Sequence, residues 1–329
     1  MNFSSDFKKL IKNSAIEIFS NSLRINKRIN KIYTMEYLTI LNLHRVSTDD
    51  GSSYTPLDPE IFTKLIIFLK KNYHIISFKD IQEKKIKEFS LSKKPKVILS
   101  FDDGYKDFIE IAHPILMKYG IRANHNIVPI CVEKDRPPFN VILQDYIGKN
   151  NREKYFKLKI PNYYWNKSLN KLEEGIKLSS FLKNKTRIEQ EKYESICYDQ
   201  IGEKLYDDAT KMMSIKDIIY LKDYHDLGAH SFRHSSMANE TNEYFIKDLK
   251  LCSRWFEDNL DMNPYIYAFP NGSYKKSHLK IARDNGYSQL LLVDQKFSKI
   301  RNNIHTRFNF HAFTEKEMIY KATGSSAKL

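Results

Sequence analysis

The sequence has few cysteines and no long hydrophobic run. Its 329 residues include three cysteines, Cys131, Cys197 and Cys252, and no two of them form a Cys-x-x-Cys pair. This argues against a disulfide framework and a thiolate zinc site, and it fits a reducing compartment. No apolar run approaches the roughly 20 residues that cross a bilayer. Residues 1–28 also lack an apolar core of signal-peptide length, so we expect a cytoplasmic protein.

Positive charge is what the sequence has in excess. The 54 lysines and arginines outnumber the 40 acidic residues, for a formal net charge of +14. Such a charge attracts nucleic acid, anionic lipid headgroups or phosphorylated substrates, although a solvated basic surface explains it equally well. No zinc finger, homeodomain arm or aromatic RNA-binding signature is present, so we expect no nucleic-acid partner. Residues 3–23 can form an amphipathic helix, which would allow peripheral contact with the anionic inner face of a membrane.

Short apolar runs alternate with helical patterns along most of the chain. A helix is expected after Asp58-Pro59, where apolar residues recur on one face behind a proline at the first helical position. Alternation of this kind predicts a mainly parallel sheet, either a barrel or a doubly wound sheet. The strands expected from the apolar runs cover residues 37–43, 97–101, 127–132, 226–231, 265–269, 289–293 and 304–310.

The segment from 133 to 213 interrupts this alternation. It is rich in Lys, Glu, Asn and Tyr, it opens with Arg136-Pro137-Pro138, and its patterning is mainly helical. We expect it to be a helical insertion carried on a loop of the main sheet, because segments of this length are usually structured or functional. The expected organisation is therefore an N-terminal helical extension over 1–36 and a catalytic domain over 37–329 that contains the insertion.

Polar motifs follow three of the expected strands. Asp102 and Asp103 follow the first, His230 and His234 the second, and the Pro270-Asn271-Gly272 turn the third. Because the carboxyl ends of parallel strands carry the active site, these motifs are candidates for one site. Two imidazoles four residues apart can share a metal if their segment is a helical turn, and a carboxylate can complete the ligand set. Taken singly, each motif also fits a solvated turn or a surface histidine.

Together and in this order, the motifs resemble those of the polysaccharide deacetylase family, carbohydrate esterase family four. Residues 100–104 match its Thr/Ser-Phe-Asp-Asp-Gly motif, residues 230–234 match His-Ser/Thr-x-x-His, and residues 269–272 match the core of its third motif. The resemblance covers about residues 41–309 and includes a His-Arg-Val segment at His44. It implies a distorted (β/α) barrel with fewer than eight complete units, plus the helical insertion.

The resemblance also implies roles for individual residues. Asp103, His230 and His234 are expected to bind a divalent metal, most often zinc, and Asp102 is expected to be the general base. A metal held by two imidazoles and one carboxylate keeps open positions, where bound water becomes hydroxide-like near pH 7. The backbone N–H of Asn271 is expected to stabilise the oxyanion. Residues expected to contact the sugar are Tyr105, Pro270, Asn271 and Gly272.

Two parts of the family pattern differ here. The arginine that often supports the base, four residues before the glycine of the third motif, is replaced by Ala268. The late motif that supplies a general acid is not clear, and His305 and His311 flank its place. We expect His305 to be the acid, with His311 as an alternative, and Arg307 is a candidate for the missing supporting cation.

The function expected from these features is removal of N-acetyl groups from an amino sugar. Its substrate would be a glycan or a lipid- or nucleotide-linked precursor in surface polysaccharide biosynthesis. Two alternatives remain open at this point. Two histidines and one carboxylate also describe the facial triad of non-haem iron oxygenases. Alternatively, the chain keeps the fold as a carbohydrate-binding protein with impaired catalysis, as Ala268 and the unclear acid suggest.

Overall fold

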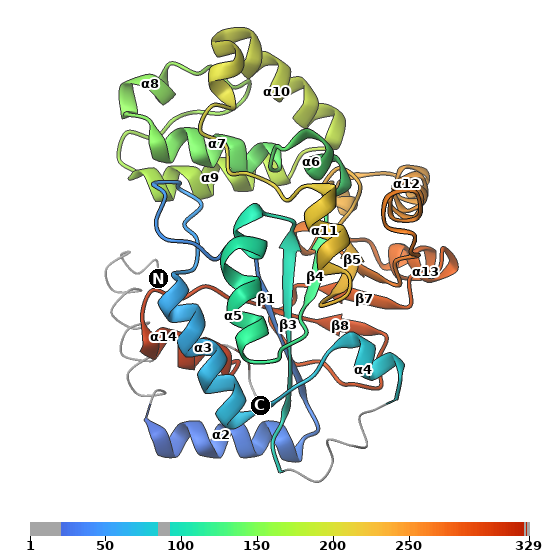
Figure 1. The fold of residues 1–329 in the computed structure, drawn as a ribbon. Helices are drawn as coiled ribbons and strands as arrows, with labels where there is room; N and C mark the ends of the chain where they lie inside the picture. The colour runs from blue at the N-terminus through green and yellow to red at the C-terminus, as the bar shows by residue number, and fades with distance from the viewer. Residues whose placement is uncertain (1–20, 85–92, 326, 328–329) are drawn as a thin grey trace.

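The computed structural model describes residues 21–84, 93–325 and 327. Part of the predicted N-terminal extension, including most of the expected 3–23 helix, lies outside these residues. The described part of the extension forms α2, Ser22–Thr34, which begins at an Asn21 cap. Figure 1 shows α2 at one end of the barrel and the helices of the insertion at the other. Among the described residues, none of the helices combines the length and apolar character that crossing a bilayer requires.

The strands form one sheet whose paired strands all run parallel. Their order is β8-β7-β6-β5-β4-β3-β1-β9, and the short β2 pairs with the start of β3. The strands are β1 Leu38–Leu43, β2 His74–Ile75, β3 Lys96–Asp103, β4 Asn124–Ile127, β5 Asp226–Ala229, β6 Ile266–Ala268, β7 Gln289–Leu292, β8 Ile304–Thr306 and β9 Phe308–Asn309.

One segment nearly closes this sheet into a barrel. The first half of residues 304–309 pairs with β7, and the second half pairs with β1 at the other edge of the sheet. Arg307 lies between the two halves. The predicted distorted (β/α) barrel is therefore confirmed.

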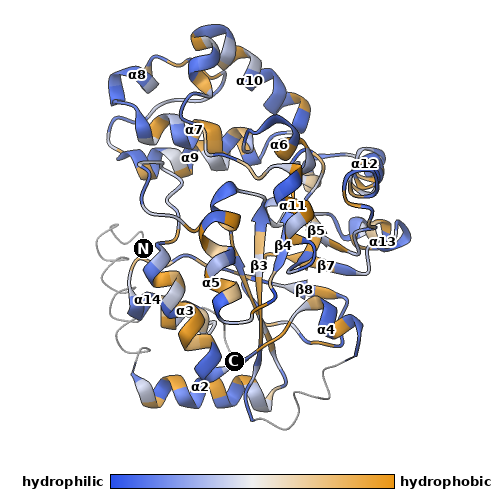
Figure 2. Ribbon diagram, viewed as in Figure 1, coloured by the Kyte–Doolittle hydropathy of each residue, from blue (hydrophilic) through white to orange (hydrophobic). Residues whose placement is uncertain are grey.

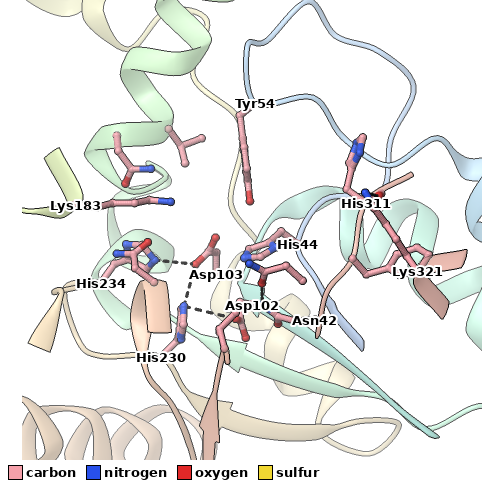
Figure 3. Close-up of a pocket in the computed structure, with 16 residues that line it drawn as sticks. Asn42, His44, Tyr54, Asp102, Asp103, Lys183, His230, His234, His311 and Lys321 are labelled. Atoms are coloured by element: carbon pink, nitrogen blue, oxygen red, sulfur yellow. Dashed lines mark hydrogen bonds and ion pairs between the residues drawn. The ribbon is translucent and has the colours of Figure 1, made fainter. Parts of the chain in front are cut away.

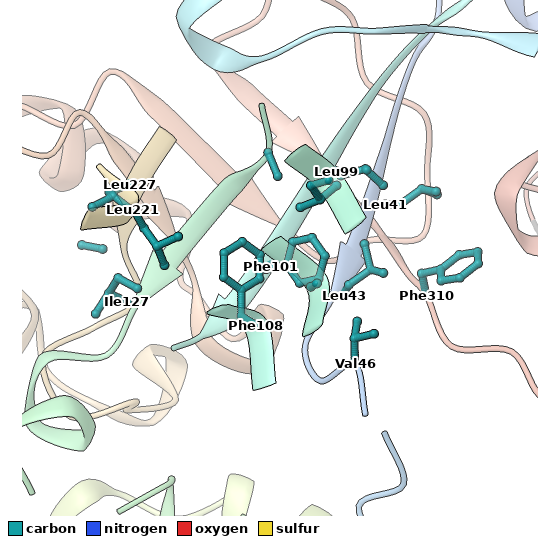
Figure 4. Close-up of a cluster of buried hydrophobic side chains, with 14 of the residues drawn as sticks. Leu41, Leu43, Val46, Leu99, Phe101, Phe108, Ile127, Leu221, Leu227 and Phe310 are labelled. Carbon is teal, nitrogen blue, oxygen red and sulfur yellow. The ribbon is translucent and has the colours of Figure 1, made fainter. Parts of the chain in front are cut away.

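Helices cover the outside of the barrel and pack on its apolar outer face. The cluster drawn in Figure 4 includes Leu41 and Leu43 of β1 and Leu99 and Phe101 of β3. Figure 2 shows the same polarity in the helices, whose hydrophobic sides face the sheet. These helices are α3 Pro59–Asn72, the π-helix η2 Phe108–Ala112, α5 His113–Lys118, α11 Ile215–Leu221, α12 Asn242–Leu260, α13 Lys276–Asp284 and α14 Glu315–Ala322. The short α4 Phe78–Gln82 instead packs Phe78 into a second apolar cluster, with Leu38 and Ile40 of β1.

The interior of the barrel changes from apolar to polar along the strands. At the amino ends, Leu38, Ile40 and Ile98 form a small apolar cluster with Ile266 and Leu291. Further along β1, β3 and β4, asparagine and serine side chains form a polar layer, in which Ser100 donates to Asn124 at 2.7 Å. The two aspartates follow this polar layer, so the interior leads directly to the site.

Residues 129–213 contain helices with a core of their own. Side chains from Phe139 to Leu205 form a separate apolar cluster. Figure 1 shows these helices together above the carboxyl ends of the strands. They are α6 Pro129–Lys134, α7 Phe139–Lys149, α8 Arg152–Phe156, α9 Lys171–Lys183, α10 Arg187–Ile201 and the 3₁₀ turn η3 Gly202–Leu205. The strand expected over 127–132 is wrong in position: β4 ends at Ile127, because Pro129 begins a helix.

Candidate active site

The ends of β3 and β5 bring one carboxylate and two imidazoles together. Oδ1 of Asp103 lies 3.4 Å from Nε2 of His230 and 3.3 Å from Nε2 of His234. One ligand atom from each of the three residues lies within 4.8 Å of the others, and Figure 3 shows the three groups facing one another. The spacing places three potential metal ligands around one point.

The hydrogen bonds of these residues favour a cation at that point. Nδ1 of His230 is 2.9 Å from the carbonyl of Ala268, so this nitrogen carries the hydrogen and Nε2 presents a lone pair to Asp103. Burial lowers the pKa of His230 to about 4, so the ring is neutral at pH 7. Oδ1 of Asp103 is buried without a hydrogen-bond partner among the described groups. Two acceptors facing each other repel unless a cation lies between them, so the donor set fits a divalent metal.

The His-x-x-x-His segment is a turn and not the helical turn that we considered. Ser231 and His234 both have left-handed backbone conformations, with φ of 60° and 56°. Asp248 of α12 holds the turn, because its Oδ1 accepts from the Ser231 hydroxyl and the Phe232 N–H, both at 3.0 Å. Asp103 is strained as well, with φ of 81°. Strain of this kind persists where surrounding contacts fix a functional geometry.

Asp102 lies beside this cluster and is held by Arg307. The guanidinium makes a two-pronged contact with the carboxylate, at 2.8 Å and 2.9 Å, and Asn126 donates to Oδ1 at 2.7 Å. Arg307 is fully buried and also donates to Asn42 at 2.7 Å. Burial raises the pKa of Asp102, but the charge of Arg307 and its hydrogen bonds outweigh burial and hold the pKa below its ordinary value. Asp102 is therefore an ionised carboxylate 3.8 Å from Nε2 of His230.

Arg307 thus supplies the cation that supports Asp102. In the third motif, Ala268 replaces the arginine that often has this role. Arg307 reaches Asp102 from the segment that closes the barrel, on the opposite side from Ala268 of β6. Sequence reasoning named Arg307 only as an alternative. The signal that would have selected it is the alternation over residues 307–310, where Arg307 and Asn309 share one face of the segment and Phe308 and Phe310 share the other.

His305, by contrast, is not in the site. It is fully buried, and its two ring nitrogens are 2.8 Å from Ser298 Oγ and 2.8 Å from Gln289 Oε1. Its ring packs on Phe78 at the apolar end of the barrel. His305 therefore lies at the apolar end of the barrel and not at the carboxyl ends of the strands, where the site is. The expectation that His305 protonates the leaving amine needs correction.

The aspartates and imidazoles open into a pocket of about 410 Å³ (Figure 3). Of the residues expected to contact the sugar, only Asn271 lines this pocket. Tyr105 is fully buried below Tyr54, whose ring takes the place expected for Tyr105. Pro270 and Gly272 shape the turn instead, which hydrogen bonds from Gly272 N–H and Ser273 N–H close at 3.1 Å and 2.9 Å. The lining residues are Asn42, His44, Tyr54, Asp102, Asp103, Asn140, Val141, Lys183, His230, His234, Asn271, Val293, Asn309, Phe310, His311 and Lys321.

Two histidines of the pocket differ in how they are held. His311 is 3.2 Å from the carbonyl of Pro56 through Nε2 and lies beside Lys321. His44, at the end of β1, faces the ring of Tyr54 edge-on at 6.1 Å and lies near both aspartates. Burial lowers the pKa of His44, while the charges of Asp103 and Asp102 oppose that shift. Among the imidazoles that line the pocket outside the ligand set, His44 is thus the one that the aspartates influence directly.

The helical insertion contributes one wall of the pocket, which the sequence did not indicate. Asn140 and Val141 come from α7, and Lys183 ends α9. Burial lowers the pKa of the Lys183 ammonium, and the charge of Asp103 opposes this shift. No sequence signal distinguished these residues from other polar residues of the insertion, because only their packing over the barrel brings them to the site.

Comparisons with known proteins agree with this geometry. A family model for polysaccharide deacetylases matches residues 174–290, which include the His-x-x-x-His segment and the Pro-Asn-Gly turn. No curated protein sequence is significantly similar to the chain. The fold resembles the Streptococcus pyogenes deacetylase PplD in complex with acetate, with a TM-score of 0.56 and 15% identity over 87% of this chain and 98% of that one.

Two further structures share the fold. One is the de-N-acetylase from Aggregatibacter actinomycetemcomitans, with a TM-score of 0.55 and 15% identity over 87% of this chain and 99% of that one. The other is IcaB from Ammonifex degensii, with a TM-score of 0.56 and 13% identity over 88% of this chain and 97% of that one. The motifs, the match over residues 174–290 and the shared barrel all support the resemblance of the chain to the polysaccharide deacetylase family.

Proposed function

We propose that the protein is a metal-dependent hydrolase that removes N-acetyl groups from an amino sugar in a glycan or glycan precursor. The observation that carries this proposal is the position of Asp102, an ionised carboxylate held by Arg307 beside the Asp103, His230 and His234 cluster. The metal, for which zinc is our first candidate, would lower the pKa of a bound water and polarise the acetamide carbonyl.

We assign proton transfer, stabilisation of the oxyanion and protonation of the leaving group to residues of the chain. Asp102 accepts a proton from the attacking water, and Arg307 and Asn126 keep its carboxylate fixed for this transfer. We assign the developing oxyanion to the backbone N–H of Asn271, because the N–H groups of Gly272 and Ser273 already bond within the turn. In place of His305, His44 is the group that we propose to protonate the leaving amine, because it faces the same pocket near both aspartates.

Two further parts of the proposal concern the cellular compartment and the carrier of the substrate. The buried, unpaired state of Cys131, Cys197 and Cys252 suits a reducing compartment, and we therefore propose a cytoplasmic substrate such as a lipid- or nucleotide-linked sugar on the way to a surface polysaccharide. The net charge of +14 would favour such pyrophosphate substrates or contact with an anionic membrane face.

Acetate release from a panel of N-acetylated sugars, with metal content measured in parallel, tests the proposal. We expect wild type loaded with zinc to release acetate without oxygen, and Asp102→Asn to lose about 10²- to 10⁴-fold in kcat while it keeps its metal. The exposed Asp258→Asn on α12 is the matched control. Turnover that requires oxygen would favour the iron oxygenase alternative. Equal absence of acetate from wild type and Asp102→Asn would favour the binding-protein alternative.

A further inference from the structure

Two lysines line the pocket, Lys183 and Lys321, and in the described part of the chain Lys183 has no carboxylate paired with it. Asp102 and Asp103 are the carboxylates among the lining residues, and Arg307 already neutralises Asp102. Lys321 lies 3.0 Å from Glu317 and also donates to the carbonyl of His311. In the described part of the chain, the Lys183 ammonium makes no hydrogen bond or ion pair, and the carboxylate that attracts it is Asp103.

That attraction disappears if Asp103 binds a metal. A divalent cation shared by Asp103 and the two imidazoles would leave a half-buried ammonium close to a second positive centre. A charge in such a place is costly unless an anion accompanies it. The structure therefore holds Lys183 where an anionic ligand group would stabilise it.

Contacts with the barrel fix the position of this lysine. Asn239, in the 3₁₀ turn η4 Met237–Asn239, donates to the Lys183 carbonyl at 3.1 Å. Glu240 accepts from the Arg187 N–H at 2.6 Å, which attaches the start of α10 to the same loop. Figure 3 shows the Lys183 side chain reaching into the pocket above Asp103 and His234. These contacts hold the backbone at Lys183 beside the pocket, and its side chain extends from there over the reacting centre.

We propose that Lys183 is a specificity-determining residue that binds an anionic group of the substrate, either a sugar carboxylate or a phosphate ester close to the acetamide. This inference rests on the proposed deacetylase function and narrows its substrate class to acidic glycans or phosphorylated precursors. A lysine serves such groups as a point charge with three donors. The helical insertion is then the element that selects the substrate.

Kinetics on matched substrates test this assignment. The probes are N-acetylhexosamine oligosaccharides that carry no charge, a carboxylate or a phosphate ester next to the acetylated residue. We expect wild type to prefer one anionic class over the neutral one by about 10- to 100-fold in kcat/KM, the factor that a charge-assisted hydrogen bond provides. Lys183→Met should lose this preference mainly through KM, and Lys183→Arg should retain most of it. Comparison of kcat/KM between the carboxylate-bearing and the phosphate-bearing oligosaccharides shows which anion Lys183 binds.

Calorimetry gives a second readout that does not depend on turnover. The deacetylated anionic sugar should bind wild type about 10- to 100-fold more tightly than Lys183→Met, with a salt dependence that the neutral sugar lacks. Lys185→Met is the matched control, because Lys185 lies two residues further on and faces Glu189 at 4.0 Å.

Specific outcomes would overturn the inference. Wild type that treats neutral and anionic sugars alike excludes an anion site at Lys183. A fall in kcat on all substrates in Lys183→Met, not rescued by arginine, would instead show a proton-donor or structural role. If wild type releases acetate from no substrate, the proposed deacetylase function fails, and calorimetry alone then decides whether Lys183 binds anions.

Discussion

The contact between Asp102 and Arg307 joins catalysis to stability at the scale of single residues. Both groups are buried, and two parallel hydrogen bonds link them. Because the pKa of Asp102 lies below its ordinary value in the folded chain, the pair contributes stability above about pH 4 and loses it as the pH falls further. Removal of either partner leaves an uncompensated buried charge.

We therefore expect Arg307→Met to lower the free energy of unfolding by about 3–5 kcal/mol. The largest effect that opposes burial would then be gone and the pKa of Asp102 would rise, so the remaining activity should fall more steeply between pH 8 and pH 5 than in wild type. Urea unfolding and a pH–rate profile measure the two effects. Arg283→Met, at an exposed site on α13, is the control. An unchanged acidic limb would contradict the proposed support of Asp102.

His125 carries a second prediction at this scale. It is fully buried on β4 between Phe101 and Phe108, and both ring nitrogens lack a partner among the described groups. Burial lowers its pKa to about 3, so the folded chain keeps it neutral while the unfolded chain takes up a proton below about pH 6.5. Stability is then fully present above pH 6.5 and declines as the pH falls.

His125→Phe should reduce this decline and raise stability at pH 7.5 by about 1–3 kcal/mol, since it removes two unsatisfied polar atoms. Urea unfolding at pH 7.5 and pH 5 measures the difference. Equal losses in wild type and variant over this interval would show that His125 does not govern acid sensitivity.

At the scale of elements, the insertion is joined to the pocket by close packing against residues 51–54. Ser53 Oγ donates to the carbonyl of Gln144 on α7 at 2.7 Å. A Cβ on Gly148 would lie 2.2 Å from the carbonyl oxygen of Gly51, and one on Gly175 would lie 2.1 Å from Ser53 Oγ. The two glycines let the helices approach the loop that carries Tyr54 into the pocket.

Gly148→Ala should displace this loop. We expect a several-fold rise in KM and a loss of about 1–3 kcal/mol in stability, with metal affinity unchanged because the ligands come from other elements. Gly202→Ala is an informative contrast: no atom lies within 4 Å of its Cβ position, so only its positive φ resists the change. A KM equal to that of wild type would show that the position of this loop does not affect substrate binding.

At the scale of the whole molecule, metal binding should stabilise the barrel. The three candidate ligands come from β3 and the turn after β5, so a shared ion links parts of the chain that separate on unfolding. At a free metal concentration 100 times the Kd, the stabilisation is about 2.7 kcal/mol. A chelator should therefore lower the Tm of wild type by several degrees, and zinc should restore it. Asp103→Ala should abolish the response, and a response of equal size in that variant would place the ion elsewhere.

Much of this fold could be predicted from the sequence because its elements are locally specified. Asp58 caps α3, as the pattern indicated. Thr241 caps α12, and Ser214 with Asp217 forms the capping box of α11. The strand expected over 127–132 was wrong in position because a short apolar run fits a buried strand and a buried helix equally well. Pro129, which begins α6, gave the better signal.

The sequence by itself determined which residues could meet at the site. Asp102 and Asp103 stand at the end of β3, His230 and His234 follow β5, and parallel strands bring their carboxyl ends to one edge. Only the tertiary structure decided the rest of the pocket. Arg307 reaches Asp102 because residues 304–309 close the barrel, and Lys183 reaches the pocket because α9 packs over it. Arg307 and Asp102 are 205 residues apart, and Lys183 and Asn239 are 56 residues apart. No local pattern records contacts of such range.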